Sequence, residues 1–432
     1  MAILSHHKKN KVDESQNQKT LPHLPHEILV QIISRIPATT ILRYCHPFPP
    51  LSHCNNGFDA IISNPTFPRF FQSHNINTSF LAFNGCTNSA TLIEYNYDDN
   101  NDQHRKIEYN IDIMNFINRD ILSKSIVELL DSCNGCILVA VMRKVPYALR
   151  QLWRPLPTLL HLHLVNPITQ RRVEIPKPHN ADGQSNNFAF ALGYSSKTDV
   201  FKVVRVSSDF PPSNILTAQV FTICGGARPG VGVRVGGRDN DLNRWKTITQ
   251  SLTIEFTPTP TSSIDAVALN GCLHWLIDDS NFILKFDIDE EKFELIHTPR
   301  NLAIMELYYD LGVLDGLLYV SAYTSNNYAE IEFRVMKEYG VEDSWSYFTF
   351  IENKFLNKDF FRLIKVLEKG KILMLNSNYG EERYSLEVYD PKQRERDDHS
   401  RRVEILEGLD KKIRRRINVK YFVPSFLSLR YI

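Results

Sequence analysis

The fold is decided by a phrase that occurs three times: CNGCILVAV at residues 133–141, LNGCLHWLI at 269–277 and LDGLLYVSA at 314–322. Each copy has Asn or Asp followed by Gly, and then a run of apolar residues. Asn-Gly and Asp-Gly are strong short-range signals for a tight turn between two antiparallel strands. A looser copy, EKGKILMLN, lies at 368–376. We therefore predict β-hairpins that recur along most of the chain.

A second phrase joins a strand, a polar turn and a strand that closes on Pro. It occurs as LHLVNPITQRRVEIP at 162–176 and as ILKFDIDEEKFELIHTP at 283–299, and SLEVYDPKQRE at 385–395 begins in the same way. Hairpins with two apolar faces cannot bury both faces alone, so such units must stack around a common axis.

The spacing of the repeats predicts the architecture. Gly271, Gly316 and Gly370 are separated by 45 and 54 residues, the length of one four-stranded propeller blade. At about 45 to 50 residues per blade, the chain from residue 76 onward has room for six or seven blades. We predict a mainly β, kelch-like propeller over 76–432.

The start of the chain has a helical pattern instead. In LPHEILVQIISRIP, at 24–37, apolar residues recur at spacings of three and four, which places them on one stripe of a helix that ends before Pro37. Further short helices are predicted from Thr39 or Thr40 through Tyr44 and over residues 58–62. We expect a small all-α module at 21–75, preceded by a polar, disordered lead at 1–20.

Composition excludes several classes of partner. The 50 Lys and Arg residues are balanced by 49 Asp and Glu residues, so the chain lacks the excess of cations that nucleic-acid binding needs. The best apolar stretch, residues 137–142, is far shorter than the roughly 20 residues that span a bilayer. With no secretory signal pattern and an odd number of scattered cysteines, we expect no nucleic acid, no membrane, reduced thiols, and a place in the cytoplasm and/or nucleus.

Neither a metal site nor a catalytic centre is predicted. Two Cys/His pairs, at 45–46 and 53–54, are separated by three prolines, and neighbouring residues do not easily ligate one ion together. The single CxxC at 133–136 is expected to be a structural turn, and His274 is expected to fill a strand position. Gly-x-Ser-x-Gly and His-Glu-x-x-His are both missing. We expect no catalytic residues, no metal and no cofactor.

Three polar segments leave alternatives open. The glycine-rich stretch 225–237 is either an unpatterned loop or, with its arginines, a grip for an acidic patch of a substrate. The basic cluster at 411–416 is either a nuclear signal or a solvated face. The acidic residues at 287–291 are explained by an exposed turn, although paired carboxylates on a propeller also occur in glycosidases.

Taken in series, these segments resemble plant F-box proteins that carry an F-box-associated, kelch-like β-propeller domain. The opening and close of the F-box are similar to residues 24–37 and to IISNPTFPRFFQSHN at 61–75. The propeller phrases that follow in the family's order are LLDSCNGCILVA (129–140), VNPITQRRVEIP (165–176), LGYSSKTDVFKVVRV (192–206), LNGCLHWLIDDSNFILKFDIDEEKFELI (269–296), VMKEYGVEDSWSYF (335–348), VYDPK (388–392) and KYFVPSFLSL (420–429).

The resemblance implies a substrate adaptor that is not itself an enzyme. In that family the F-box docks on the Skp-type linker of a cullin-RING ubiquitin ligase, and the propeller captures a protein substrate, which here is unknown. The apolar stripe of the first helix exceeds what a small helical module can bury internally, and such an excess usually meets a partner. The expected linker-binding residues are Leu24, Pro25, Ile28, Leu29, Ile32, Ile33, Ile36, Pro37 and Leu42.

The sequence departs from the family at residues 43–58, RYCHPFPPLSHCNNGF. Pro47, Pro49 and Pro50 each remove a backbone donor and together prevent a helix there, where the family continues its second helix into a Cys-Lys-x-Trp phrase. The alternative function is therefore a propeller scaffold or decoy with a degenerate F-box that joins no ligase. A first helix that merely packs on the propeller and a propeller enzyme acting on a glycan are the further alternatives.

Overall fold

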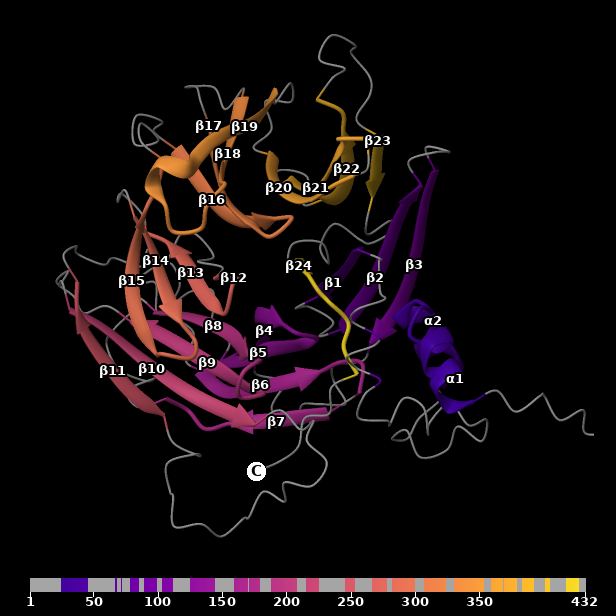
Figure 1. Cartoon of the computed structure of the whole chain (residues 1–432). Coiled ribbons are helices and arrows are strands. Elements are labelled where there is room, and N and C mark those ends of the chain that lie inside the picture. Colours follow the sequence, from indigo (N-terminus) through magenta and orange to yellow (C-terminus); the bar gives the residue numbers. More distant parts are fainter. Residues whose placement is uncertain are drawn as a thin grey trace, which may run out of the picture.

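The protein is a ring of β-sheets with amino-terminal helices packed at its side (Figure 1). It is represented by a computed structural model. The residues that the structure describes are 25–45, 67, 71, 78–84, 89–98, 103–111, 125–143, 159–169, 171–178, 188–207, 215–224, 245–252, 266–277, 282–299, 307–323, 330–352, 359–367, 369–378, 383–391, 401–404 and 417–426.

The described strands form six antiparallel sheets of four strands each, which we number as blades along the chain. Blade 1 contains β24 (Ile417–Tyr421), β1 (Thr78–Asn84), β2 (Ser89–Asp98) and β3 (Gln103–Ile111). Blade 2 contains β4 (Ser125–Cys133), β5 (Cys136–Arg143), β6 (Leu159–Asn166) and β7 (Arg171–Ile175). Blade 3 contains β8 (Phe188–Ser195), β9 (Val200–Ser207), β10 (Ile215–Cys224) and β11 (Lys246–Ser251).

The second half of the ring is built in the same way. Blade 4 contains β12 (Val267–Leu269), β13 (Cys272–Leu276), β14 (Phe282–Asp287) and β15 (Lys292–His297). Blade 5 contains β16 (Leu307–Leu314), β17 (Leu317–Tyr323), β18 (Glu330–Met336) and β19 (Trp345–Glu352), with a short 3-10 helix, η3 (Glu342–Ser344), before β19. Blade 6 contains β20 (Asp359–Val366), β21 (Ile372–Asn378), β22 (Arg383–Tyr389) and β23 (Arg401–Glu404).

The repeated Asn-Gly and Asp-Gly phrases form the turn between the first two strands of a blade. Backbone φ is +46° at Asn134 and +77° at Gly135, and Asp315 and Gly316 have φ of +48° and +81°. A two-residue hairpin turn with positive φ at both positions matches the right-handed twist of its strands, and Gly, Asn and Asp tolerate that region best. The predicted hairpins and blade spacing are thus confirmed, and the described strands give six blades.

The carboxyl-terminal strand closes the ring. β24 pairs antiparallel with β1, so that Tyr421 lies opposite Phe80. At the end of β24 the hydroxyl of Ser132 donates to the carbonyl of Tyr421 at 2.9 Å, and beyond the strand the side-chain amide of Asn166 donates to the carbonyl of Ser425 at 3.0 Å. The end of the chain therefore holds blade 1 against blade 2.

Neighbouring blades share apolar cores because successive residues of a strand point to opposite faces. In β5, Leu138 and Ala140 face blade 3, whereas Ile137 and Val139 belong to the core shared with blade 1. Similar clusters fill the spaces between the other adjacent pairs. A strand that is buried on both faces reads as a continuous apolar run, which explains the stretch at 137–142.

The amino-terminal helices are α1 (His26–Ile33) and α2 (Ala38–Cys45), as the periodicity predicts. α2 packs against β2 and β3 of blade 1 (Figure 1). The helix predicted over 58–62 lies outside the described residues, as do the lead at 1–20, the glycine-rich stretch 225–237 and the basic cluster at 411–416. A complete all-α module is therefore not established, and the kelch character of the propeller stays a prediction.

Neither α1 nor α2 is long and apolar enough to cross a membrane, and the same holds for every helix in the described ranges.

Candidate functional site

Helix α1 has two apolar faces, of which only one packs against the protein. Val30 and Ile33 are buried in the core that blades 1 and 2 share. Ile28 and Ile32 are 42% and 49% exposed. Since residues four apart lie on the same side of a helix, these two isoleucines form one exposed ridge. The ridge is the kind of apolar surface that a partner helix can cover.

The second helix is held on the propeller by a buried carboxylate. Glu94 of β2 accepts hydrogen bonds from the backbone nitrogens of Ala38 and Thr39 at 2.8 and 2.9 Å, and from the hydroxyl of Thr39. The first N–H groups of a helix have no partner within the helix, and a negative charge there also complements the helix dipole. Arg43 adds a contact, donating to the carbonyl of Glu108 at 2.8 Å.

A third contact links the helical region to the end of the chain. Phe67 and Phe71, both helical and fully buried, pack edge-on against Phe426 with ring centroids 5.2 and 4.9 Å apart. Phe422 belongs to the same core. Segments from both ends of the chain therefore share one core with blades 1 and 2, which fixes the exposed ridge of α1 relative to the ring.

The nine residues predicted to bind a linker fall into four groups. Pro25, Ile28 and Ile32 are exposed, whereas Leu29, Ile36 and Pro37 are half-buried. Ile33 and Leu42 are buried in the core, because they face the propeller, and Leu24 lies outside the described residues. The structure thus places part of the predicted stripe at the surface, and linker binding itself stays a prediction.

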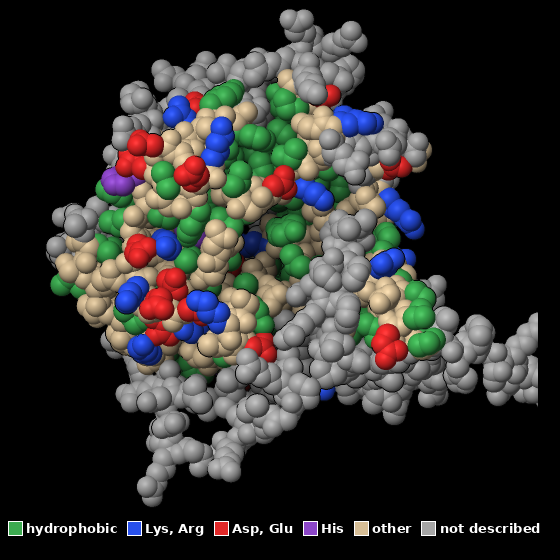
Figure 2. All heavy atoms as spheres, viewed as in Figure 1, with side chains coloured by type: hydrophobic (Ala, Val, Ile, Leu, Met, Phe, Trp, Pro, Cys, Tyr) green, Lys and Arg blue, Asp and Glu red, His purple; other side chains and the backbone are tan. Residues whose placement is uncertain are grey.

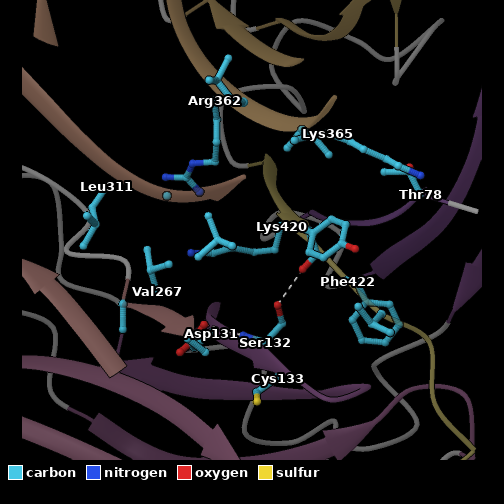
Figure 3. A pocket seen from close by; sticks show the side chains of 18 of the residues that line it. Thr78, Asp131, Ser132, Cys133, Val267, Leu311, Arg362, Lys365, Lys420 and Phe422 are labelled. Carbon is cyan, nitrogen blue, oxygen red and sulfur yellow. Dashed lines mark hydrogen bonds between the residues drawn. The ribbon is translucent and has the colours of Figure 1, made fainter. Parts of the chain in front are cut away.

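A second candidate site is a cavity of about 610 Å³ at the centre of the ring. Its wall comes from the innermost strands of several blades, namely β4, β12, β16, β20 and β24. Figure 2 shows the molecule hollowed near the middle of this face. The side chains of Arg362 and Lys420 point into the cavity (Figure 3).

Two charged side chains that line the cavity make contacts across blades. Arg362 of blade 6 makes two contacts with the carboxylate of Asp310 in blade 5, at 3.0 and 3.1 Å. Asp131 of blade 2 accepts a hydrogen bond from the backbone nitrogen of Leu192 in blade 3, at 2.8 Å. Such paired groups hold the inner strands in place and give the cavity a mixed polar wall.

Two exposed apolar side chains belong to the cavity wall. Tyr421, the last residue of the inner strand β24, is 53% exposed, and Val423, two residues further on, is 39% exposed; both line the cavity. Tyrosine is favoured at protein interfaces because it combines a large apolar area with a polar tip. We call these two residues the rim of the cavity; Arg362 and Lys420 line the same cavity.

The single CxxC has the structural role that the sequence predicts. Cys133 ends β4 and Cys136 begins β5, and both are free thiols. Burial raises the pKa of Cys133 to about 12 and raises the pKa of Cys136 well above its ordinary value. Because the thiolate is the reactive species, these protonated sulfurs are suited to packing.

His274 also fills a strand position, as predicted. It is fully buried in β13, where its Nδ1–H donates to the carbonyl of Val267 at 3.0 Å. Its Nε2 accepts from the hydroxyl of Tyr339 at 2.7 Å. Both ring nitrogens are therefore used, and burial lowers the pKa of His274 to about 4.

Sequence reasoning missed Glu94 and the cavity wall. Glu94 lies in an ordinary alternating strand, and its partner Ala38 is 56 residues away. The wall is assembled from strands of different blades, so no local pattern marks it. The Phe-Val-Pro segment at 422–424 near the end of the chain was the one available signal for the rim.

The closed ring of six four-stranded sheets defines a β-propeller, a class of scaffold that carries binding sites at the ends of its central channel. Comparison with known proteins identifies the group. The chain belongs to the F-box associated beta propeller domain family, which it matches over residues 81–426. That match begins within β1, after α2, and runs past the end of β24.

Two relatives from Arabidopsis thaliana are F-box proteins. F-box protein CPR1 is 26% identical over 208 residues, which are 43% of this chain and 46% of that relative, so the match spans less than half of its length. F-box protein At3g07870 is 24% identical over 342 residues, 75% of this chain and 72% of the relative. A solved nidogen/laminin complex covers 79% of this chain and 97% of its own at 8% identity, with a TM-score of 0.34, which is too low to support an argument.

Proposed function

We propose that this chain is a substrate-recognition adaptor of a Skp-cullin-F-box ubiquitin ligase. Membership of the F-box-associated propeller family and the similarity to two F-box proteins support the general role. The observation that carries the proposal is the exposed ridge of Ile28 and Ile32, on a helix whose other face is locked to the propeller. In this role the chain performs no catalysis of its own.

The linker is proposed to cover the ridge of α1. The exposed parts of the two isoleucines are apolar area that a partner surface can remove from water. Each Å² of apolar area buried in this way contributes about 25 cal/mol of favourable free energy to binding. Pro25 and Leu29 lie beside them and extend the surface. Ile33 and Leu42 are left out of this contact, because they are already buried against the propeller.

The protein substrate is proposed to bind at the rim formed by Tyr421 and Val423. Both residues combine exposure with a place in the cavity wall, and Lys420 and Arg362 line the same cavity. A substrate held there is kept at a fixed distance from the ligase, because Glu94 and the shared aromatic core tie α2 to the ring. Tethering of this kind raises the effective concentration of a substrate lysine near the conjugating enzyme to roughly the millimolar range.

The proposal is tested by purifying the tagged whole chain from plant cells and asking whether the Skp-type linker and a cullin come with it. We expect both to be recovered with the wild type and lost with the double variant Ile28→Asp/Ile32→Asp. The control is Ile215→Asp in blade 3, because Ile215 is 44% exposed and this substitution places an Asp at an exposed isoleucine away from α1. Loss of the linker with the control as well would count against the ridge.

One observation favours the scaffold or decoy alternative. α2 ends at Cys45, directly before a stretch that contains Pro47, Pro49 and Pro50. If the intact wild type recovers no linker but still captures a protein through its propeller, this second function is the better one.

A further inference from the structure

Two histidines and a glutamate meet on the outer hairpin of blade 2. His161 and His163 are two residues apart on β6, so their side chains lie on the same face of the sheet. Glu174 lies on the neighbouring strand β7, directly opposite His163 in the register. The β6–β7 hairpin therefore presents three potential metal ligands from two adjacent strands.

Their geometry is compact. Nδ1 of His161 lies 2.8 Å from Oε1 of Glu174. The two imidazole rings are stacked nearly parallel, with centroids 6.0 Å apart and an angle of 11° between the planes. One ligand atom from each of the three side chains lies within 4.8 Å of the other two, and within the described ranges this is the one group of three such ligands.

His163 gives the independent reason to expect a ligand. Its side chain is 4% exposed, and its buried Nδ1 has no hydrogen-bond partner among the described residues. A buried polar atom normally has a partner, and leaving one without a partner costs free energy. His274 follows that rule, since both of its ring nitrogens are bonded.

We propose that His161, His163 and Glu174 bind one divalent transition-metal ion, Zn²⁺ in the first place. Two imidazoles and one carboxylate are a ligand set that zinc accepts, with a fourth position left to water. Zinc–ligand bonds of about 2.0–2.2 Å require the three ligand atoms to lie closer to one another than the present separations, which reach up to 4.8 Å. His161 and Glu174 can make this movement, because their side chains are only partly covered. Their exposure also leaves a path for the ion from solvent.

The bound ion would join β6 to β7, the two outermost strands of blade 2. An ion that binds the folded chain and not the unfolded one stabilises the fold in proportion to the logarithm of its concentration. The site lies on the blade and not on the ridge of α1, so metal binding is independent of the proposed ligase role.

The test is a zinc titration of the whole chain after treatment with a chelator, followed by calorimetry. The informative variants are Glu174→Gln, which keeps a hydrogen-bonding group beside His161 but removes the charge, and the double variant His161→Ala/Glu174→Gln. The matched controls are His297→Ala and Glu294→Gln, which remove an exposed imidazole and an exposed carboxylate from blade 4. Thermal unfolding in chelator verifies that each variant folds as the wild type does.

We expect the wild type to bind one more equivalent of Zn²⁺ than the double variant. In Glu174→Gln the affinity should fall at least about 100-fold, because losing even an outer partner of a ligand costs about 10- to 100-fold. Cobalt in place of zinc should give a visible spectrum without thiolate charge transfer, which excludes the cysteines as ligands. Equal zinc stoichiometry and affinity in the wild type and the double variant would overturn the proposal, and His161 and Glu174 would then be a surface hydrogen bond only.

Discussion

Oε1 of Glu94 lies 2.8 Å from the backbone nitrogen of Ala38, although the two residues are 56 positions apart in the sequence. One belongs to the second strand of the propeller and the other begins α2. The side chain of Glu94 is 2% exposed, so this cap is shielded from water. Because α1 directly precedes α2 and packs in the same core, the contact fixes the face of α1 that is proposed to meet the ligase.

Replacing Glu94 should weaken the attachment of α2 to blade 1. We expect Glu94→Ala to lower the free energy of unfolding by about 1–3 kcal/mol, since it leaves buried N–H groups of Ala38 and Thr39 without an acceptor. Urea unfolding and protease cleavage after the helices would both report the change. Glu108→Ala, at an exposed position of the same blade, should stay within about 0.5 kcal/mol of wild type. Equal effects at the two positions would contradict the capping role.

The segment after the closing strand β24 approaches blade 2 closely at Gly135. A Cβ atom there would lie 2.1 Å from Cβ of Ser425 and 2.7 Å from its backbone nitrogen, in addition to the strain of φ at +77°. At Gly271 φ is +74° but nothing lies within 4 Å. We expect Gly271→Ala to cost about 1–2 kcal/mol, from backbone strain alone. Gly135→Ala should cost about 1–3 kcal/mol more, because Ser425 must move. Thermal and urea unfolding would measure both, and equal losses would contradict the tight packing of Ser425 against Gly135.

Stability should fall with acid through His274. Burial lowers the pKa of His274 from 6.5 to about 4, so between these values the unfolded chain takes up a proton that the folded chain does not. The contribution of His274 to the free energy of unfolding is therefore fully present above about pH 6.5. It is lost as the pH falls toward 4, and the loss is about 3 kcal/mol.

The check is urea unfolding at several values of pH between 7 and 4, for wild type and for His274→Gln. The variant loses the hydrogen bonds of the ring and starts from lower stability, but its stability should depend less steeply on pH. His297→Gln, at an exposed position of β15, should keep the wild-type slope. An unchanged slope in His274→Gln would show that another group controls the acid response.

The rim of the cavity should select the substrate. Tyr421 and Tyr347 are both 53% exposed, but only Tyr421 lines the cavity. In proximity labelling with the whole chain, we expect Tyr421→Ala to lose at least half of the labelled proteins that depend on the propeller. Tyr347→Ala should keep them. Linker recovery should be the same in both variants, and equal loss of targets in the two would place the substrate site elsewhere.

The repeated phrases predicted most of the fold because their chemistry is local. Asn134 and Gly135 adopt the positive φ that these residue types tolerate best, and the apolar strand that follows has two faces to bury. The first two helices were also predicted, since Pro25 and Pro37 bracket the first apolar stripe. These features need no knowledge of distant residues.

Sites that depend on tertiary neighbours could not be predicted in the same way. Ile33 and Ile32 are adjacent in the sequence and equally apolar, yet only Ile32 is exposed, because the propeller covers the other side of α1. His161 and His163 were open to prediction: their spacing and the hairpin that follows already place Glu174 opposite His163. The unpartnered ring nitrogen, in contrast, is visible only in the structure.

The most direct test of the central claim is the affinity of the purified whole chain for a recombinant Skp-type linker, measured by biolayer interferometry. We predict saturable binding by the wild type and by Ile215→Asp. We predict at least about a 100-fold loss for Ile28→Asp/Ile32→Asp, since interface anchors carry about 2 kcal/mol or more each. Unfolding should be unchanged in all three, because the substituted side chains are exposed. Wild-type affinity in the double variant, or no binding by a folded wild type, would contradict the account.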